Sequence, residues 1–176
     1  MIKNIILAGG CFWCTEAIFR RIKSVKTVVP GYIGGHTTNP TYKDICTGAT
    51  GHAEAISIDY DSKIVSLENI LMIFFSTHDP TTLNKQGNDI GTQYRSSIFN
   101  NDKNEIKIIL DFISDLEESN KFENRIVTTI EKKSTFYVAE NYHHDYYSLN
   151  KNVPYCSVVI VPKIKKLMDS KSSLLK

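Results

Sequence analysis

The sequence lacks a long hydrophobic run, a block of charge of one sign and a large set of cysteines. No apolar stretch approaches the ~18 residues that a membrane-spanning helix needs. The apolar residues 5–8 are too few for the ~7–15-residue core of a signal peptide. A formal net charge of +2 is too balanced to indicate a nucleic-acid partner. We therefore expect a cytoplasmic protein that binds neither nucleic acid nor a membrane.

Four cysteines in 176 residues are too few for a disulfide scaffold. Cys11 and Cys14 are close in sequence, whereas Cys46 and Cys156 are isolated. In a reducing compartment, cysteines that lie close together are more often catalytic, redox-active or metal-binding than structural. The pair at residues 11 and 14 is therefore the first candidate for chemistry.

The chain length fits one domain, in which strand-like and helix-like patterns alternate. The strand-like segments are residues 3–8, 25–35, 52–60, 93–99, 126–130 and 158–161. The helix-like segments are residues 15–22, 42–46, 66–76, 103–118 and 139–149. This order predicts an α+β or α/β architecture, with a mixed sheet and helices against it. We expect a functional or disordered loop at residues 78–92 and a solvated tail around the basic residues 163–166.

The stretch GGCFWC, residues 9–14, lies where the first strand is expected to end and a helix to begin. The free N–H groups and the dipole of a helix N-terminus favour an anion, so we expect a lowered pKa for the Cys11 thiol. Phe12 and Trp13 would form an apolar wall beside such a nucleophile. The stretch alone is also compatible with two aromatics that simply cap the core.

The cysteine pair is also compatible with two other kinds of site. Zinc needs about four Cys, His or carboxylate ligands, and no second Cys-x-x-Cys accompanies Cys11 and Cys14, so we expect no metal. A thioredoxin-like thiol–disulfide oxidoreductase shares the arrangement of strand, Cys-x-x-Cys and helix. That alternative stays open, although this chain offers many more polar residues than such a switch needs.

Several segments combine glycine with Tyr, His, Asp, Glu or Arg at loops or element ends, where a rigid scaffold carries its site. They are residues 31–35, 40–42, 48–54, 78–80 and 87–95. Glu54, near the start of a half-buried strand, is expected to be partly desolvated and to stay protonated as a general acid. Tyr42 and Tyr94 supply neutral hydroxyl donors.

Motifs in this chain resemble those of the A-type peptide methionine sulfoxide reductases, in family order from residue 9 to about 163. They are GGCFW at 9–13, GYIGG at 31–35, TGHAE at 50–54, GNDIGTQYR at 87–95, and AENYHH at 139–144 followed by PYC at 154–156. The resemblance implies a single-domain, two-layer α+β sandwich with a catalytic domain at residues 1–163 and a basic tail without cysteine at 164–176. It also implies reduction of the S epimer of methionine sulfoxide, free or in peptides. We expect the protein to be a monomer. Thioredoxin would supply the electrons, and no cofactor would be needed.

Carried over by position, the resemblance makes Cys11 the nucleophile and places Phe12 and Trp13 in the pocket for the substrate methyl group. The sulfoxide sulfur is electrophilic, but its oxygen leaves poorly unless it is protonated. Thiolate attack therefore needs a proton donor at the oxygen. The product on Cys11 is a sulfenic acid, which a second thiol reverses.

The remaining roles fall on polar residues. Glu54 is the implied acid, and it would take the Cys11 proton when substrate binds. Tyr42 and Tyr94 bind the sulfoxide oxygen, and Asp89 belongs to the polar network of the pocket. The chemical requirement for a donor at the oxygen and the resemblance thus point to the same residues.

The resolving cysteine is where this chain departs from many relatives, which carry it in a glycine-rich tail. Residues 165–176 contain no cysteine. Cys14, one helical turn from Cys11, is the first candidate, because a disulfide across two residues is feasible at a helix start. Cys156 is the second, since its segment resembles one near the pocket, and Cys46 is the third, more typical of a small buried core residue. Direct reduction by thioredoxin or another thiol stays an alternative.

Overall fold

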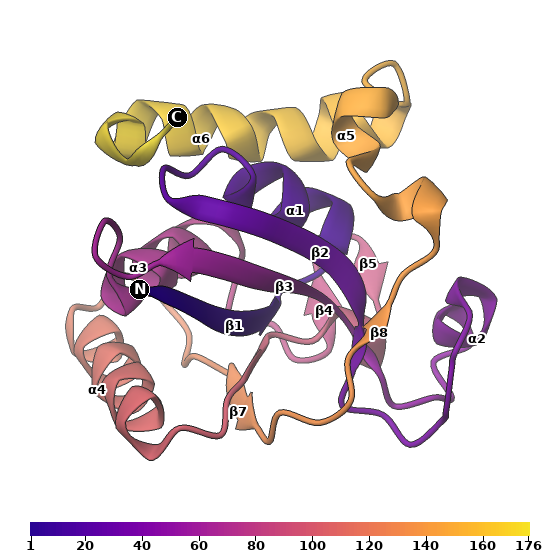
Figure 1. Cartoon of the computed structure of the whole chain (residues 1–176), viewed down its shortest axis with the longest axis horizontal. Coiled ribbons are helices and arrows are strands. Elements are labelled where there is room, and N and C mark those ends of the chain that lie inside the picture. Colours follow the sequence, from indigo (N-terminus) through magenta and orange to yellow (C-terminus); the bar gives the residue numbers. More distant parts are fainter.

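A computed structural model describes residues 1–176 as a six-stranded sheet with its main helices packed against one face (Figure 1). The strands run in the order β7-β6-β1-β3-β2-β8. Their bounds are Ile2–Ala8 (β1), Val25–Ile33 (β2), Ala53–Asp61 (β3), Ser97–Phe99 (β6), Thr129–Glu131 (β7) and Tyr137–Val138 (β8). All neighbours pair antiparallel except β6 and β7, which are parallel. The expected α+β fold with a mixed central sheet is confirmed.

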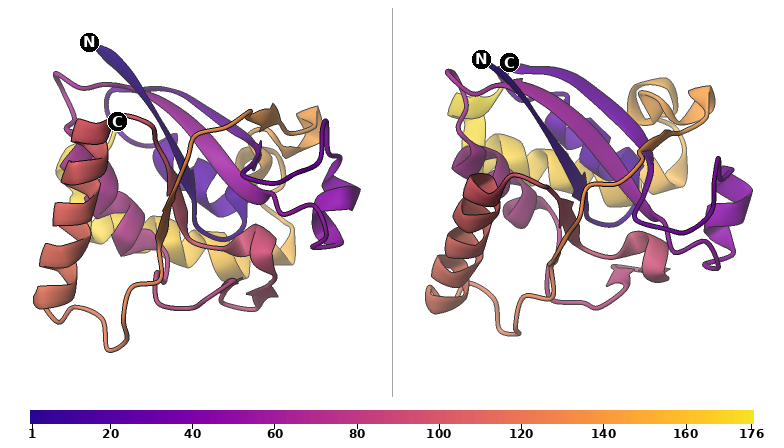
Figure 2. Two further views of the ribbon diagram at one scale, coloured as in Figure 1. Left: turned by 90° about the horizontal axis from the view of Figure 1, so that it is seen from below. Right: turned by 60° about the horizontal axis from the view of Figure 1, so that its bottom comes forward.

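The helices lie mainly on one side of this sheet. They are Phe12–Phe19 (α1), Tyr42–Cys46 (α2), Leu67–Thr77 (α3), Lys103–Glu118 (α4), Tyr146–Leu149 (α5) and Val161–Lys171 (α6). A small hairpin pairs β4 (Lys85–Gln86) with β5 (Asp89–Ile90) inside the long polar loop. Helix α1 packs against β2 and β3 and lies between the sheet and α6 in the two turned views (Figure 2). None of the helices combines the length and apolar character needed to cross a membrane.

The core follows from the alternation of side chains along the strands. On β1, Ile5 and Leu7 join the large cluster beneath the helices, whereas Ile6 and Ala8 join a smaller cluster with Phe99 on the opposite face. Successive side chains of a strand point to opposite faces, so a strand buried on both sides reads as a continuous apolar run. A shift of β1 by one residue would exchange its two sets of side chains between the clusters. The burial of both faces therefore determines the register of β1, and with it the position of Cys11.

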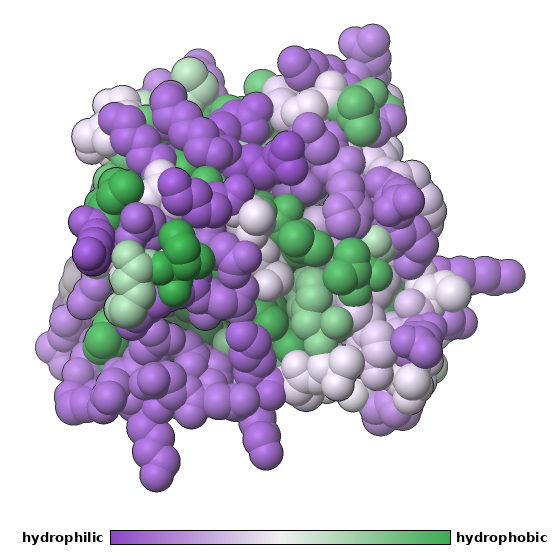
Figure 3. Space-filling model, in the orientation of Figure 1, coloured by the Kyte–Doolittle hydropathy of each residue, from purple (hydrophilic) through white to green (hydrophobic).

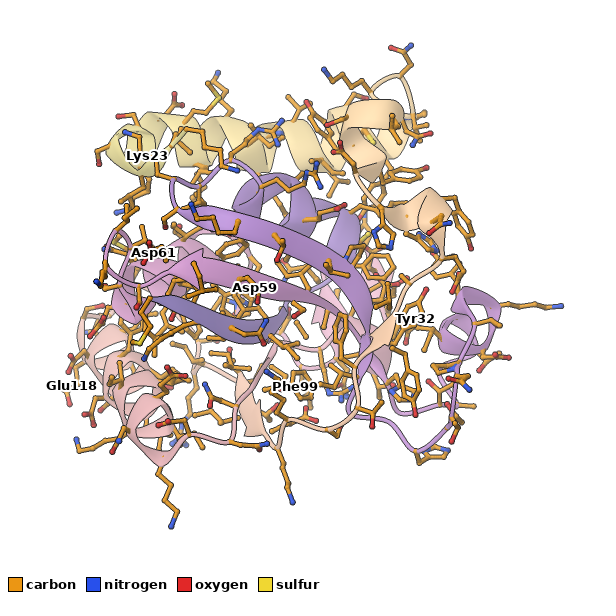
Figure 4. The ribbon with its side chains drawn as sticks, viewed as in Figure 1. Lys23, Tyr32, Asp59, Asp61, Phe99 and Glu118 are labelled. Carbon is orange, nitrogen blue, oxygen red and sulfur yellow. The ribbon has the colours of Figure 1, made fainter.

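Helix α4 covers the edge of the molecule with a single apolar stripe. Its N-cap Asp102 accepts hydrogen bonds from the N–H groups of Asn104 and Glu105, and only Ile109 of the helix is fully buried. The outer surface over α4 is almost entirely hydrophilic, whereas hydrophobic side chains show near the middle of the same view (Figure 3). Glu118 at the end of α4 and Asp61 at the end of β3 lie far from Tyr32, which is at the end of the sheet that carries the site (Figure 4).

The C-terminal quarter differs from the expectation. Residues 158–161 form no strand: a π-helical segment, Cys156–Ile160, continues directly into α6. The expected solvated tail is also wrong, because Ile164 and Leu167 are buried in the main core and the expected boundary at residue 163 falls inside α6. The strand prediction failed because a run of β-branched residues has high strand propensity whether or not the sheet has room for it.

The helix expected at 139–149 is also corrected. It is reduced to a 3₁₀ turn, Asn141–His143, and the single helical turn of α5. A residue with left-handed backbone, Asp145 (φ 52°), separates the two. The resulting irregular segment turns His143 inward, where its side chain is fully buried.

Candidate active site

A tight turn of two glycines delivers Cys11 to the N-terminus of α1. Gly10 has φ 84°, and a Cβ atom there would lie 2.5 Å from the Gln86 side chain, so no other residue fits without displacement. Cys11 is the N-cap of α1, and its carbonyl accepts the N–H of Cys14 at 3.1 Å. The strand–turn–helix placement expected for this stretch is therefore confirmed.

Glu54 of β3 reaches the start of this helix. Its Oε2 accepts the Phe12 N–H at 3.1 Å, and its side chain is 1% exposed. Burial raises the pKa of Glu54 to about 8, partly offset by the Phe12 hydrogen bond. The carboxyl group is therefore mostly protonated at neutral pH, as expected, although it is fully rather than half buried.

The pKa values of the two thiols shift in opposite directions, and that of Cys11 is not lowered as expected for a helix N-terminus. Burial raises the pKa of Cys11 well above its ordinary value, and the neighbouring Cys14 and Glu54 add to the effect. The expected lowered pKa of Cys11 is thus wrong, because Glu54 takes the Phe12 N–H and burial outweighs the remaining donors. A hydrogen bond from the Cys11 thiol lowers the pKa of Cys14, and Lys163 and Tyr155 act in the same direction.

Tyr155 connects Cys14 to Asp89. The Tyr155 hydroxyl donates to Asp89 Oδ2 at 2.7 Å and lies 3.8 Å from Cys14 Sγ. Burial raises the pKa of Tyr155, so the hydroxyl stays protonated. Asp89, on the β4–β5 hairpin, is thereby held beside both cysteines.

Trp13 stands at the mouth of the site in an aromatic frame. Its indole stacks on Tyr146 with ring centroids 3.7 Å apart and meets the edge of Tyr155 at 5.8 Å. The indole Nε1–H donates to His143 Nδ1 at 2.9 Å. Trp13 is half-buried, whereas Phe12 is 1% exposed and packs behind it against His143. The orientation of the indole is therefore fixed by both stacking and a hydrogen bond.

Tyr42 and Tyr94 approach the same carboxyl group from two other elements. Tyr42 opens α2, and Tyr94 ends the 3₁₀ turn Thr92–Tyr94. Burial raises the pKa of both tyrosines, and the charge of Glu54 is the next largest cause for each. Both hydroxyls are therefore neutral donors near the Glu54 carboxyl group.

A cavity of about 530 Å³ opens at the thiols. Cys11, Cys14, Asp89 and Tyr155 line it together with residues of the β4–β5 hairpin and of the C-terminal helix. Glu54, Phe12, Trp13, Tyr42 and Tyr94 do not line this cavity.

A comparison with known protein families identifies the family of this chain. Residues 3–174 match the model of the peptide methionine sulfoxide reductases. The chain belongs to this family. The reductase is 53% identical over 162 residues to the peptide methionine sulfoxide reductase MsrA of Saccharolobus solfataricus. The aligned region covers 92% of this chain and 90% of the relative.

Solved structures agree with the family assignment. Reduced Mxr1 of Saccharomyces cerevisiae has a TM-score of 0.79 and 37% identity, covering 88% of this chain and 89% of the other. Mxr1 in complex with Trx2 has a TM-score of 0.55 and 28% identity, covering 82% and 84%. The enzyme is a thiol-dependent methionine sulfoxide reductase, and the thioredoxin-like oxidoreductase alternative is not favoured.

The other two cysteines of the reductase are poorly placed for resolution. Cys156 is fully buried within the continuous helical run from Cys156 to Lys171, and its N–H donates to the Val153 carbonyl at 2.9 Å. Cys46, expected in the core, is instead exposed at the C-terminal end of α2. That expectation failed because Ile45, one position earlier, is the residue of α2 that faces the core.

Sequence reasoning gave no role to Tyr155, Tyr146 or Lys163, and it left open whether His143 packs, supports another site residue or touches substrate. Tyr155, Tyr146 and His143 lie in or beside motifs that carry the resemblance, but spacing alone gives no role to an aromatic side chain. Lys163 was not identified as a site residue, because the basic residues 163–166 were expected to form a solvated tail. No group of three or more His, Cys, Asp or Glu side chains is close enough to hold a metal ion.

Proposed function

We propose that Cys11 of the reductase attacks the sulfur of methionine S-sulfoxide while Glu54 protonates the sulfoxide oxygen. The observation that carries this assignment is the position of Glu54, a buried, mostly protonated acid bound to the N–H of the residue after Cys11. Tyr42 and Tyr94 donate their hydroxyls to the same oxygen. Together they stabilise the charge that develops there as the S–O bond weakens.

Glu54 also activates the nucleophile. The pKa of the Cys11 thiol is raised at rest, so the thiol must lose its proton when substrate binds. A carboxyl group with a pKa of about 8 is close to neutral pH, where a group exchanges protons most effectively in both directions. In this scheme the minor ionised fraction of Glu54 takes the Cys11 proton and, as the protonated acid, then gives it to the sulfoxide oxygen.

Trp13 binds the methyl group of the substrate, and His143 positions it. His143 Nδ1 accepts a hydrogen bond from the indole N–H, so the neutral imidazole carries its own proton on Nε2. This Nε2 atom lies 3.5 Å from a Glu140 carboxylate oxygen. Burial lowers the pKa of His143 and keeps the ring neutral. Phe12 supports this wall from behind, and Asp89 orders the polar side of the pocket.

Cys14 resolves the sulfenic acid left on Cys11. Both thiols line one cavity, and the lowered pKa of Cys14, for which Cys11 is the largest cause, supplies thiolate at neutral pH. Attack forms the Cys11–Cys14 disulfide and releases the hydroxyl group as water. Cys156 is less suitable, because it would have to leave a helix that is packed into the core.

Thioredoxin is the proposed reductant of this disulfide. The support is the structural similarity to Mxr1, which is known in complex with Trx2. Four free thiols suit a reducing compartment, so we place the enzyme in the cytoplasm and propose that it acts as a monomer.

Single-turnover chemistry tests these assignments. Reduced enzyme is mixed with S- or R-methionine sulfoxide in the absence of reductant. The S epimer should yield one methionine per enzyme and a disulfide that mass spectrometry places between Cys11 and Cys14, whereas the R epimer should yield none. Cys14→Ser should still make one methionine and leave a sulfenic acid that dimedone traps. Turnover of the R epimer alone, or a disulfide without Cys14, would refute the scheme.

A further inference from the structure

Helix α6 brings a lysine to the cavity at the thiols. Lys163 lines this cavity together with Cys11, Cys14 and Tyr155. The helix is anchored by the buried Ile164 and Leu167, so the position of Lys163 is fixed by the core. Its ammonium group is half-buried and belongs to none of the ion pairs in the structure.

The cavity adjoins a second groove of about 500 Å³, and Gln86, Pro162 and Lys163 line both. Lys121 and Lys166 also line this groove, and neither forms an ion pair. Burial lowers the pKa of Lys121, and the charges of Lys166 and Lys171 lower it further. Three ammonium groups that form no ion pair therefore face a common space, which favours an anion.

The other titratable groups of the groove do not cancel this charge. Asp79 accepts hydrogen bonds from the N–H and hydroxyl groups of Thr81, and Glu123 is exposed at the rim. His78 is buried between the Phe74 carbonyl and Ser96, and burial lowers its pKa to about 4, so it adds no charge. With both carboxylates counted, the groove keeps one net positive charge.

The groove is separate from the residues that we assign to the sulfoxide. Glu54, Tyr42 and Tyr94 line neither the groove nor the cavity at the thiols, whereas Cys11 and Asp89 line the cavity but not the groove. A molecule in the groove reaches the cavity at Cys14 past Pro162 and Lys163 of α6, which line both spaces. The groove is therefore free for a second reactant.

We propose that the lysine groove formed by Lys121, Lys163 and Lys166 admits a low-molecular-weight thiol bearing carboxylates, which reduces the Cys11–Cys14 disulfide. The inference rests on the proposed role of Cys14 and adds a reductant class to it. Lys163 and Lys166 bind the carboxylates, and the thiolate of the same molecule reaches Cys14. Glutathione is a thiol of this class.

The reaction takes two displacements. The incoming thiolate attacks Cys14 Sγ, a new S–S bond forms, and Cys11 takes a proton from solvent as it departs, because burial raises its pKa and disfavours a free thiolate. A second thiolate attacks the outer sulfur of this mixed disulfide and releases Cys14 as a thiolate beside Lys163 and the Tyr155 hydroxyl. Two thiols are oxidised to one small disulfide, and the enzyme disulfide is reduced to two thiols.

Stopped-flow reduction of the preformed disulfide tests the groove. The oxidant diamide makes the Cys11–Cys14 disulfide without sulfoxide, so the test does not depend on the reductase reaction. Mercaptopropionate, glutathione and neutral mercaptoethanol are compared by the fluorescence of Trp13, the single tryptophan, with rates expressed per thiolate. The variants are Lys163→Gln combined with Lys166→Gln, and the matched control Lys165→Gln, an exposed residue of the same helix that lines neither cavity.

We expect the two carboxylate thiols to react about three- to tenfold faster than mercaptoethanol with the wild-type and control proteins, with less advantage at high salt. The double variant should lose this advantage, which is taken as the ratio of each carboxylate-thiol rate to the mercaptoethanol rate of the same protein, because Lys163 also acts on Cys14 itself. An equal advantage in all three proteins would overturn the proposal, as would failure of diamide to link the two cysteines. Unchanged small-thiol rates with impaired reduction by thioredoxin would also overturn it and would assign the groove to a protein partner.

Discussion

Replacing Glu54 by Gln should make the reductase more stable while it removes most of the activity. The buried carboxyl group has a folded-state pKa of about 8, against an ordinary value near 4.5. Below the ordinary value both states are protonated and nothing is lost. As the pH rises, the unfolded state ionises first, so folding loses about 1.4 kcal/mol per pH unit until the folded-state group ionises as well.

At pH 7 this loss amounts to about 3 kcal/mol, and it reaches about 5 kcal/mol above pH 8. Glutamine is uncharged at every pH and keeps an oxygen for the Phe12 N–H. The Glu54→Gln variant should therefore unfold at higher urea at pH 7 than the wild type, and the difference should shrink below 1 kcal/mol near pH 5. Its single-turnover rate should fall by about 10²–10⁴-fold, the range for a general acid.

Urea unfolding followed by circular dichroism at pH 5, 7 and 8.5 measures the stability difference, and rapid-quench formation of methionine measures the rate. Glu118→Gln is the matched control, because this glutamate is exposed at the end of α4 and forms no ion pair. A stability difference that is the same at all three pH values would refute the buried, protonated state of Glu54. Near-normal single-turnover rates in the variant would refute its role as the acid.

Three further outcomes follow from the geometry. Cys156→Ser should cycle with thioredoxin at the wild-type rate in steady-state assays, and a loss of more than about tenfold would transfer the resolving role to Cys156. Trp13→Ala should raise the KM for methionine sulfoxide about tenfold or more by removing the methyl-binding ring, whereas His143→Gln should change kcat and KM less; equal effects of both would contradict a positioning role for the histidine. Leu167→Ala should lower the free energy of unfolding by about 2–5 kcal/mol in urea titrations, because the side chain is fully buried; a loss under about 0.5 kcal/mol would restore the solvated tail.

The first two-thirds of the fold could be predicted because local pattern and tertiary burial agree there. The helix at 103–118 is found at the expected bounds, with apolar residues at helical spacing and an N-cap at Asp102. The strand at residues 3–8 is found because its apolar run ends at two glycines. In both segments propensity, periodicity and end signals point to the same structure.

The C-terminal segment could not be assigned in the same way, because its signals conflict. Residues 158–161 are β-branched and favour a strand, whereas Ile160, Ile164 and Leu167 recur at spacings of four and three and favour a helix. The sheet already ends at β8, so the helix prevails and buries these three side chains. The periodicity was available in the sequence, but β-propensity outweighed it over so short a window.

Some features of the site could likewise be predicted from the sequence, and others could not. The types of Cys11, Glu54 and the two tyrosines follow from what sulfoxide reduction requires, so a sequence can indicate them. The pKa of Cys11 could not be foreseen, since it depends on burial and on Glu54 occupying the Phe12 N–H. Lys163 could not be foreseen either, because its relation to Cys14 exists only through the packing of α6.

A disulfide between Cys11 and Cys14 would close a ring within a single helical turn. Oxidation and reduction then rearrange a few atoms at the tip of α1, and the rest of the molecule keeps one outline throughout the cycle. A partner protein that distinguishes the oxidised enzyme from the reduced one therefore finds little difference in surface shape. It must recognise the disulfide by its reaction with a thiol.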